Sequence, residues 1–147
     1  MPDPTVNQYY TEDHEHLQAA LHRFQSLKAG EPDKAAEAFH GFKAGLERHI
    51  LWEERILFRW YDQQLGHLSN CLTASLRRDH GQILVYLDEI SRKLAQGNVA
   101  TGDEEGRLET LLRFHNQKEE QALYPAMDQI LNDEQRAAVF VAMKKAK

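Results

Sequence analysis

Two eleven-residue stretches of the chain repeat one arrangement of side chains that could bind a metal ion. The first reads HILWEERILFR from His49, and the second reads HNQKEEQALYP from His115. In each, a glutamate stands four residues after the histidine, which gives the pairs His49/Glu53 and His115/Glu119. Side chains four residues apart on an α-helix lie about 40° apart on one face and about 6 Å apart along the axis. Each pair can therefore reach a common point.

The repeat extends beyond these two stretches. Their histidines are 66 residues apart, and the same offset relates Asp13-His14 to Asp79-His80. In both halves the upstream histidine precedes the His-x-x-x-Glu motif by 35 residues. We therefore expect two helix pairs related by a pseudo-twofold axis, each contributing one histidine from its first helix and a His-x-x-x-Glu from its second.

The spacing of apolar residues predicts an all-α protein, because no segment alternates with the period of two that is typical of strands. The first expected helix is capped by Thr11 and ends at Gly30, and the second runs from Pro32 to Tyr61 or Leu65. The third is capped by Ser69 or Asn70 and ends near Gly97. A fourth carries the apolar residues from Leu108 to Met127, and a C-terminal helix is capped by Asp133. Short connections between long helices favour an up-down-up-down four-helix bundle with a short C-terminal helix.

The length of 147 residues fits a single domain, 1–147. Within it we expect pseudo-repeats at about 10–65 and 69–131 and the C-terminal helix at about 133–147. The net charge of -5 argues against nucleic-acid binding, and no apolar run approaches the roughly 20 residues of a membrane span. The N-terminus lacks the features of a signal peptide, and the single cysteine suits a reducing compartment, so the expected location is cytoplasmic.

The repeated histidines and glutamates lie on apolar stripes, so four imidazoles and two carboxylates are expected inside the bundle. Burying unpaired charges would cost several kcal/mol for each ionised group. A pair of cations would offset the two negative charges and use the imidazole lone pairs. The predicted metal ligands are His14, His49, Glu53, His80, His115 and Glu119. Mixed imidazole and carboxylate ligation suits iron first, with manganese or zinc as alternatives.

Several neighbouring residues are weaker candidates. Glu54 and Glu120 lie 100° further round their helices, which favours a supporting or solvent-facing position over direct ligation. His40 forms a Glu-x-x-His motif without a second copy and is interpreted as a surface residue. His16 is rotated 200° from His14, whereas His22 is the better candidate for a fifth histidine ligand.

This pattern resembles the hemerythrin-like family of HHE cation-binding domains. The resemblance spans residues of about 10–130 and rests on Asp13-His14, His49-x-x-x-Glu53-Glu54, Asp79-His80 and His115-x-x-x-Glu119-Glu120-x-x-Leu123-Tyr124-Pro125. It implies an up-down four-helix bundle that holds two iron ions in a non-haem di-iron centre. Carried over to this chain, His14 and His49 would lie on one half, His80 and His115 on the other, and Glu53 and Glu119 would be bridges.

The chain departs from the oxygen-carrying members of that family. Those members have a His-x-x-x-His motif on the third helix, whereas in this chain Leu76 stands four residues before His80. Their last carboxylate is an aspartate five residues after the final histidine, whereas both Glu119 and Glu120 are glutamates here. The set of four histidines and two glutamates is more similar to domains associated with repair of iron-sulfur centres or with sensing of iron, oxygen or nitric oxide.

Three functions follow from these observations. The leading hypothesis is a di-iron protein that binds or senses a diatomic ligand, O2 or NO, or iron. Its open coordination position is expected where Leu76 replaces a histidine, with Trp52, Trp60 or tyrosine residues forming the pocket wall. The alternative is a di-iron peroxidase or oxidase, or an iron-sulfur repair factor; no general acid or base is recognisable apart from the ligands, which favours a non-enzymatic role. The third is a metal-free bundle used for packing or dimerisation, and whether the C-terminal helix forms a homodimer stays open.

Overall fold

The computed structural model of the chain describes residues 3–66 and 71–146, and within these ranges every regular element is a helix. The elements are α1 (Val6–Leu27), α2 (Pro32–Trp52), the π-helical turn η1 (Glu53–Leu57), α3 (Phe58–Leu65), α4 (Cys71–Ala95), α5 (Gly102–Lys118), the π-helical turn η2 (Glu119–Leu123), α6 (Tyr124–Ile130) and α7 (Asp133–Lys145).

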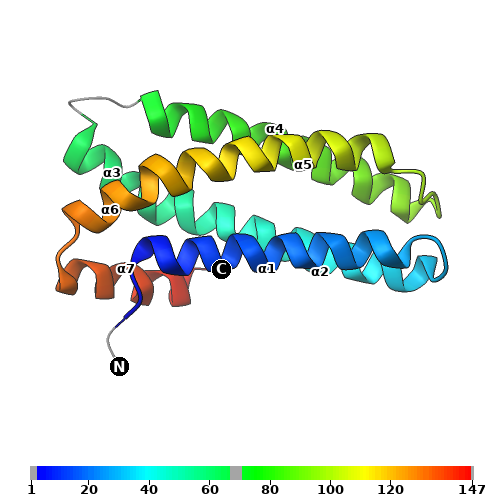
Figure 1. The fold of residues 1–147 in the computed structure, drawn as a ribbon, viewed down its shortest axis with the longest axis horizontal. Coiled ribbons are helices and arrows are strands. Elements are labelled where there is room, and N and C mark those ends of the chain that lie inside the picture. Colours follow the sequence, from blue (N-terminus) through cyan, green and yellow to red (C-terminus); the bar gives the residue numbers. More distant parts are fainter. Residues whose placement is uncertain (1–2, 67–70, 147) are drawn as a thin grey trace.

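The helices form an up-down-up-down bundle, and α7 lies alongside it at one end (Figure 1). α1 runs away from the end that carries α7, α2 returns with η1 and α3, and α4 and α5 repeat this path. The predicted all-α bundle with a short C-terminal helix is confirmed. None of the helices in the described ranges is long and apolar enough to span a lipid bilayer.

The first helix begins earlier than the sequence pattern indicates. Thr5, not Thr11, is the N-cap: its hydroxyl accepts from the backbone N–H of Gln8, whose side chain accepts in return from the backbone N–H of Thr5. This reciprocal capping box satisfies two otherwise unpaired donors. Thr11 lies inside α1, where its hydroxyl donates to Asn7 at 3.0 Å. The prediction of Thr11 as the cap was therefore wrong.

The C-terminal helix is capped one residue before the expected position. Asn132 accepts from the backbone N–H of Gln135 at 2.8 Å, and Asp133 is the first residue of the helix. The expected cap at Ser69 or Asn70 lies outside the described residues. The other expected helix limits agree with the structure to within a few residues, as usual for helix ends.

The second and fourth long helices are each interrupted by one π-helical turn. The backbone N–H of Phe58 donates to the carbonyl of Glu53, and the N–H of Tyr124 donates to the carbonyl of Glu119. Residues five apart would lie about 140° apart in a regular α-helix, whereas these wider turns return them to the same side. The two turns occupy equivalent places in the repeats, at residues 53–57 and 119–123.

The apolar core is divided into two clusters. One surrounds the end that carries α7 and includes Tyr10, Trp52, Leu76 and Leu123. The other fills the opposite half and contains Leu21, Phe24, Phe39, Phe42, Leu46, Ile50, Ile83, Leu87, Ile90, Leu94 and Leu108, with Ala35. On α1 and α4, the buried histidines lie between members of the two clusters. The core therefore contains a polar layer between two apolar ones.

The apolar half that is distant from α7 gives a test of the fold. Phe39 is fully buried, whereas Phe114 is 55% exposed. Replacing Phe39 by alanine removes its contacts and leaves a cavity, so we expect a loss of about 3–5 kcal/mol in the free energy of unfolding, measured by chemical denaturation. Phe114→Ala is the control and should change it by less than about 0.5 kcal/mol. Equal losses in the two variants would contradict the placement of Phe39 in the core and of Phe114 at the surface.

Candidate metal centre

The six residues predicted as ligands meet in the polar layer. They form two groups of four that share both glutamates: His14, His49, Glu53 and Glu119 in one group, and Glu53, His80, His115 and Glu119 in the other. In each group the candidate ligand atoms lie within 4.8 Å of one another, and all six residues are buried. Side chains from α1, the α2–η1 junction, α4 and the α5–η2 junction therefore converge on one region.

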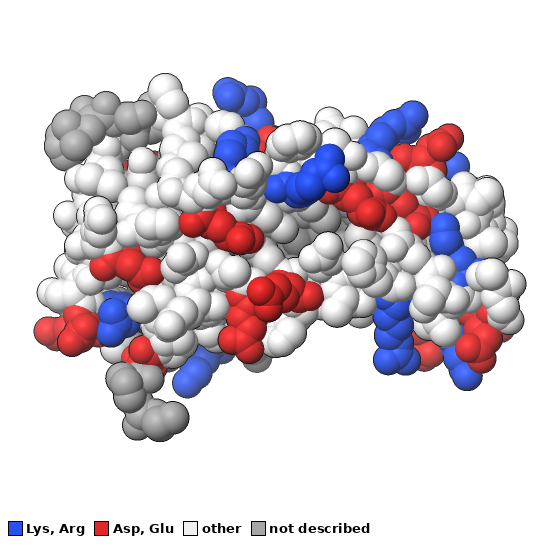
Figure 2. All heavy atoms as spheres, viewed as in Figure 1, with Lys and Arg blue, Asp and Glu red and all other residues white. Residues whose placement is uncertain are grey.

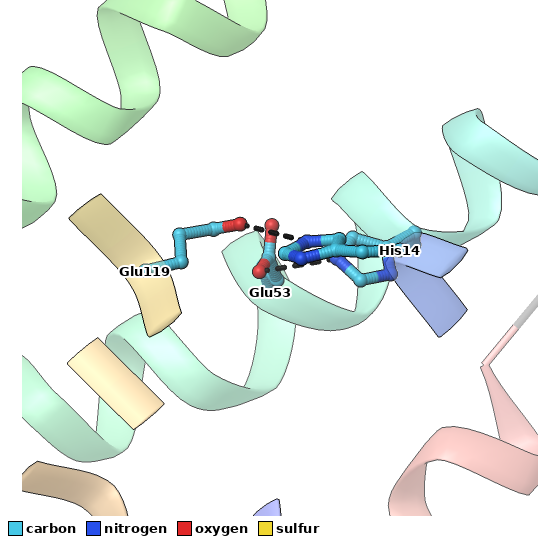
Figure 3. A group of neighbouring side chains, drawn as sticks. His14, Glu53 and Glu119 are labelled. Carbon is cyan, nitrogen blue, oxygen red and sulfur yellow. Dashed lines mark ion pairs between the residues drawn. The ribbon is translucent and has the colours of Figure 1, made fainter. Parts of the chain in front are cut away.

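Each glutamate divides its two oxygens between the groups. Oε2 of Glu53 lies 3.3 Å from Nε2 of His49, while its Oε1 lies 3.1 Å from Nε2 of His80. Figure 3 shows the carboxylates of Glu53 and Glu119 and the imidazole of His14 pointing toward one another from three elements. Glu53 therefore faces both groups of histidines.

Glu119 is placed in the same way. Its Oε1 lies 3.2 Å from Nε2 of His14, and its Oε2 lies 3.3 Å from Nε2 of His115. That Oε2 is buried and accepts no hydrogen bond from the described residues. A buried carboxylate oxygen without a donor is unfavourable unless a cation is close to it. Together with the mixed imidazole and carboxylate donors, this oxygen fits a site for metal cations.

The outer nitrogen of every candidate histidine contacts a carboxylate. The four Nδ1 contacts are His14 to Glu120 at 2.8 Å, His49 to Asp13 at 2.8 Å, His80 to Glu54 at 2.8 Å and His115 to Asp79 at 3.0 Å. An ionised carboxylate can only accept, so Nδ1 carries the proton and Nε2 faces inward. Such contacts orient imidazole ligands in metal sites and increase their basicity.

These contacts explain the doubled glutamates and the repeated Asp-His pairs. Glu54 and Glu120 belong to neither group of candidate ligands; each supports a histidine from the other repeat, His80 and His14 respectively. The repeated aspartates were visible in the sequence as part of the motif, but their contacts were not. Each bonds the histidine 36 residues further on, not its own neighbour.

The weaker histidine candidates lie away from the site. His16, His22 and His40 are exposed and belong to neither group of candidate ligands. Their positions agree with the interpretation of His16 and His40 as outward-facing. His22 does not join either group of candidate ligands as a fifth histidine. Leu76 is fully buried in the apolar cluster beside α7, which also contains Trp52.

Tyr124, which was not among the predicted metal ligands, lies inside the first group. The phenol oxygen of Tyr124 lies 2.6 Å from Oε2 of Glu53 and 3.0 Å from Oε1 of Glu119. It also lies 3.2 Å from Nε2 of His14 and 3.3 Å from Nε2 of His49. The residue at the equivalent place of the other repeat is Phe58, whose ring stacks on His80 with centroids 5.5 Å apart.

The field inside the layer is set by the two buried carboxylates. Burial disfavours the charged imidazolium of His49, but Glu53 and Asp13 outweigh this effect and raise its pKa to about 10. Burial likewise lowers the pKa of His115, but the carboxylate of Glu119 outweighs this effect and the pKa rises to about 9. Burial raises the pKa of Glu53, but the charge of His49 and a hydrogen bond with Glu119, followed by those with His49 and His80, bring it well below its usual range. The layer therefore favours bound positive charge.

A pocket of about 540 Å³ opens between α1 and α5 and reaches this layer. Its lining includes His14 and Glu120, with apolar side chains such as Leu17 and Phe42. Acidic side chains lie on both sides of the hollow between these helices in Figure 2. The candidate site is therefore reached from the surface on the side of His14.

Comparison with known proteins identifies the family. The chain matches the hemerythrin HHE cation binding domain family over residues 5–127, which include all six residues of the site. Searches of curated proteins and of solved structures gave no match. The match covers most of the 147 residues and agrees with the bundle and with its shared His/Glu groups. The chain therefore belongs to the hemerythrin HHE cation-binding domain family.

Proposed function

We propose that this protein is a non-haem di-iron protein that binds a diatomic ligand, O2 or NO. The observation that carries the proposal is the division of the oxygens of Glu53 and Glu119 between two groups of histidines. Two carboxylates shared in this way support two adjacent cations, because each glutamate directs one oxygen to each of the two groups of imidazoles. Imidazole and carboxylate donors suit iron, and also accommodate manganese or zinc.

In this arrangement one ion would be held by His14, His49 and the two glutamates, and the other by His80, His115 and the same glutamates. Bound iron supplies a redox-active centre that can bind a diatomic molecule. The protein supplies four oriented imidazoles, two bridges and a surrounding apolar core that excludes water. The pocket between α1 and α5 supports access by a small molecule.

Binding is proposed ahead of turnover. Among the described residues at the centre, the groups that could transfer a proton are the candidate ligands themselves, their carboxylate partners and Tyr124. A di-iron peroxidase or oxidase would require one of these residues to transfer a proton in addition to its role at the metal site. Turnover of hydrogen peroxide by the iron-loaded protein would favour the enzyme, whereas reversible spectral changes with NO or O2 and no turnover support the binding protein. An iron-sulfur repair factor would instead transfer iron to an apo iron-sulfur protein.

The first prediction concerns metal content. After reconstitution with ferrous iron, the unaltered protein should hold two iron ions per chain by elemental analysis. His80→Ala and His115→Ala each remove one donor from the second group and should lower this ratio and the thermal midpoint. His16→Ala and His40→Ala alter exposed histidines and should retain both ions. A folded protein that takes up no metal would refute the proposal, as would equal effects of all four substitutions.

The second prediction concerns the carboxylates that contact the outer imidazole nitrogens. Asp13→Ala and Glu54→Ala remove the acceptors that orient His49 and His80. We expect metal affinity to fall about 10–100-fold while saturating metal still fills both positions, measured by competition with a chelator. Glu12→Ala is the control, since that side chain is 69% exposed and lies next to Asp13. Unchanged affinity in both test variants would show that these carboxylates do not support the site.

The third prediction concerns the metal-free protein. The pKa values of His49 and His115 are raised from 6.5 to about 10 and about 9, so their stabilisation is complete below pH 6.5 and is lost as the pH rises through 9 and 10. The pKa of Glu53 is lowered from 4.5, so its stabilisation is lost in acid below that value. The thermal midpoint should therefore fall between pH 6.5 and 10.

Metal loading should remove this fall, because bound cations replace the protons on the inward Nε2 atoms. The measurement is a pair of thermal melts at each pH, one with metal and one with chelator. A midpoint of the metal-free protein that rises from pH 6.5 to 10 would contradict the assigned electrostatics.

A further inference from the structure

The phenol oxygen of Tyr124 occupies the place of a ligand atom. It lies 2.6–3.3 Å from one donor atom of each of the four residues in the His14 group. The contacts between imidazole and carboxylate within that group are of the same length, 3.2 Å for His14 and 3.3 Å for His49. Donor atoms at right angles around one ion lie about 3.0 Å apart when each metal–ligand distance is about 2.1 Å. The phenol oxygen therefore has the spacing of a fifth donor.

Hydrogen bonding within the protein does not fully account for this position. A phenol has one O–H, so it can donate to Glu53 or to Glu119 but not to both. The other carboxylate then lies within 3.0 Å of the phenol oxygen without receiving a hydrogen bond from it. Because both glutamates are fully buried, water does not screen this contact. A cation bonded to the phenol oxygen and to both carboxylates would remove the conflict.

The two halves of the centre differ at this position: Tyr124 contacts both glutamates, and the equivalent residue of the other repeat is Phe58. Tyr124 and Phe58 follow equivalent π-helical turns, and both side chains are fully buried beside the first histidine of a repeat. Phe58 has no oxygen to offer. The pseudo-symmetry of the fold therefore presents five donors to one ion position and four to the other.

Building on the proposed function, we infer that Tyr124 coordinates the iron ion held by His14 and His49 through its phenol oxygen. The bond forms as the phenol O–H breaks and its proton passes to solvent, with no change in oxidation state. Phenolate is an established type of protein ligand for ferric iron.

Bound cations would favour the ionised phenolate at this place, because positive charge beside the phenol oxygen stabilises a negative ligand. The ion held by His80 and His115 would then have fewer protein donors than the ion held by His14 and His49.

The test is the spectrum of the ferric protein, loaded with ferrous iron without oxygen and then oxidised with ferricyanide. Coordinated phenolate gives a charge-transfer band in the visible region and ring vibrations in the resonance Raman spectrum excited in that band. Both should be present, and the vibrations should shift when tyrosine with a deuterated ring is incorporated. A protein that holds two ferric ions without these features would overturn the inference and leave the proposed function intact.

Two substitutions assign the signal. Tyr124→Phe should abolish the band while iron content stays at two per chain. Tyr10→Phe is the matched control, because Tyr10 is also fully buried, its ring lies 5.1 Å from that of Tyr124, and its hydroxyl contacts the sulfur of Met143 instead of the glutamates. A band that survives Tyr124→Phe, or that is lost only in Tyr10→Phe, would refute the assignment. Absence of any bound iron in the unaltered protein would overturn both proposals.

Discussion

The burial of Glu53 and Glu119 is the constraint on which the rest of this structure depends. Both carboxylates have no exposed surface and lie in the middle of a helical bundle, where an uncompensated charge is strongly unfavourable. Four imidazoles face them, and four further carboxylates hold the outer nitrogens of those imidazoles. Carboxylates, imidazoles and again carboxylates thus follow one another outward from the centre. Cations bound between the inner groups complete this order, which is why the family's ability to bind cations agrees with the geometry.

The cost of this polar layer is offset on either side of it. One apolar cluster joins α7 to the ends of the other helices, and the second fills the half that contains Phe24 and Phe39. Each cluster can pack as an ordinary helical core, so the layer between them does not have to stabilise the fold. The same division explains the role of α7: the indole N–H of Trp52 donates to the carbonyl of Met143, and Tyr10 contacts the sulfur of that methionine. These contacts close the end of the bundle nearest to Tyr124.

A nearly symmetric frame carries an asymmetric centre. The π-helical turns, the histidines and their carboxylate partners all repeat, but Tyr124 corresponds to Phe58, and Tyr10 corresponds to Leu76, at the equivalent positions of the two repeats. Both tyrosines lie on the side of His14 and His49. A pocket also opens beside His14. Two chemically different ion positions can therefore arise from a repeated helix pair through changes at only a few residues.

The sequence alone determined the helical bundle and the six residues that meet in it. Both depend on short-range rules: apolar periodicity defines helices, and a spacing of four residues places His49 with Glu53 and His115 with Glu119 on one face. The repeat then indicated that the two faces converge. Thr5 was not predicted as the N-cap, because Thr11 is also a suitable capping residue and the apolar spacing does not show the reciprocal contact between Thr5 and Gln8.

Only the tertiary structure decided how these residues meet. A regular helix would turn Tyr124 about 140° away from Glu119, and the π-helical turn that brings them together leaves no mark in the apolar pattern. Proline does not explain the turn, since Pro125 follows Tyr124 whereas Arg59 follows Phe58. The pairing of Asp13 with His49 and of Glu54 with His80 likewise joins different helices. Such contacts depend on the packing of whole helices against one another, which local spacing does not specify.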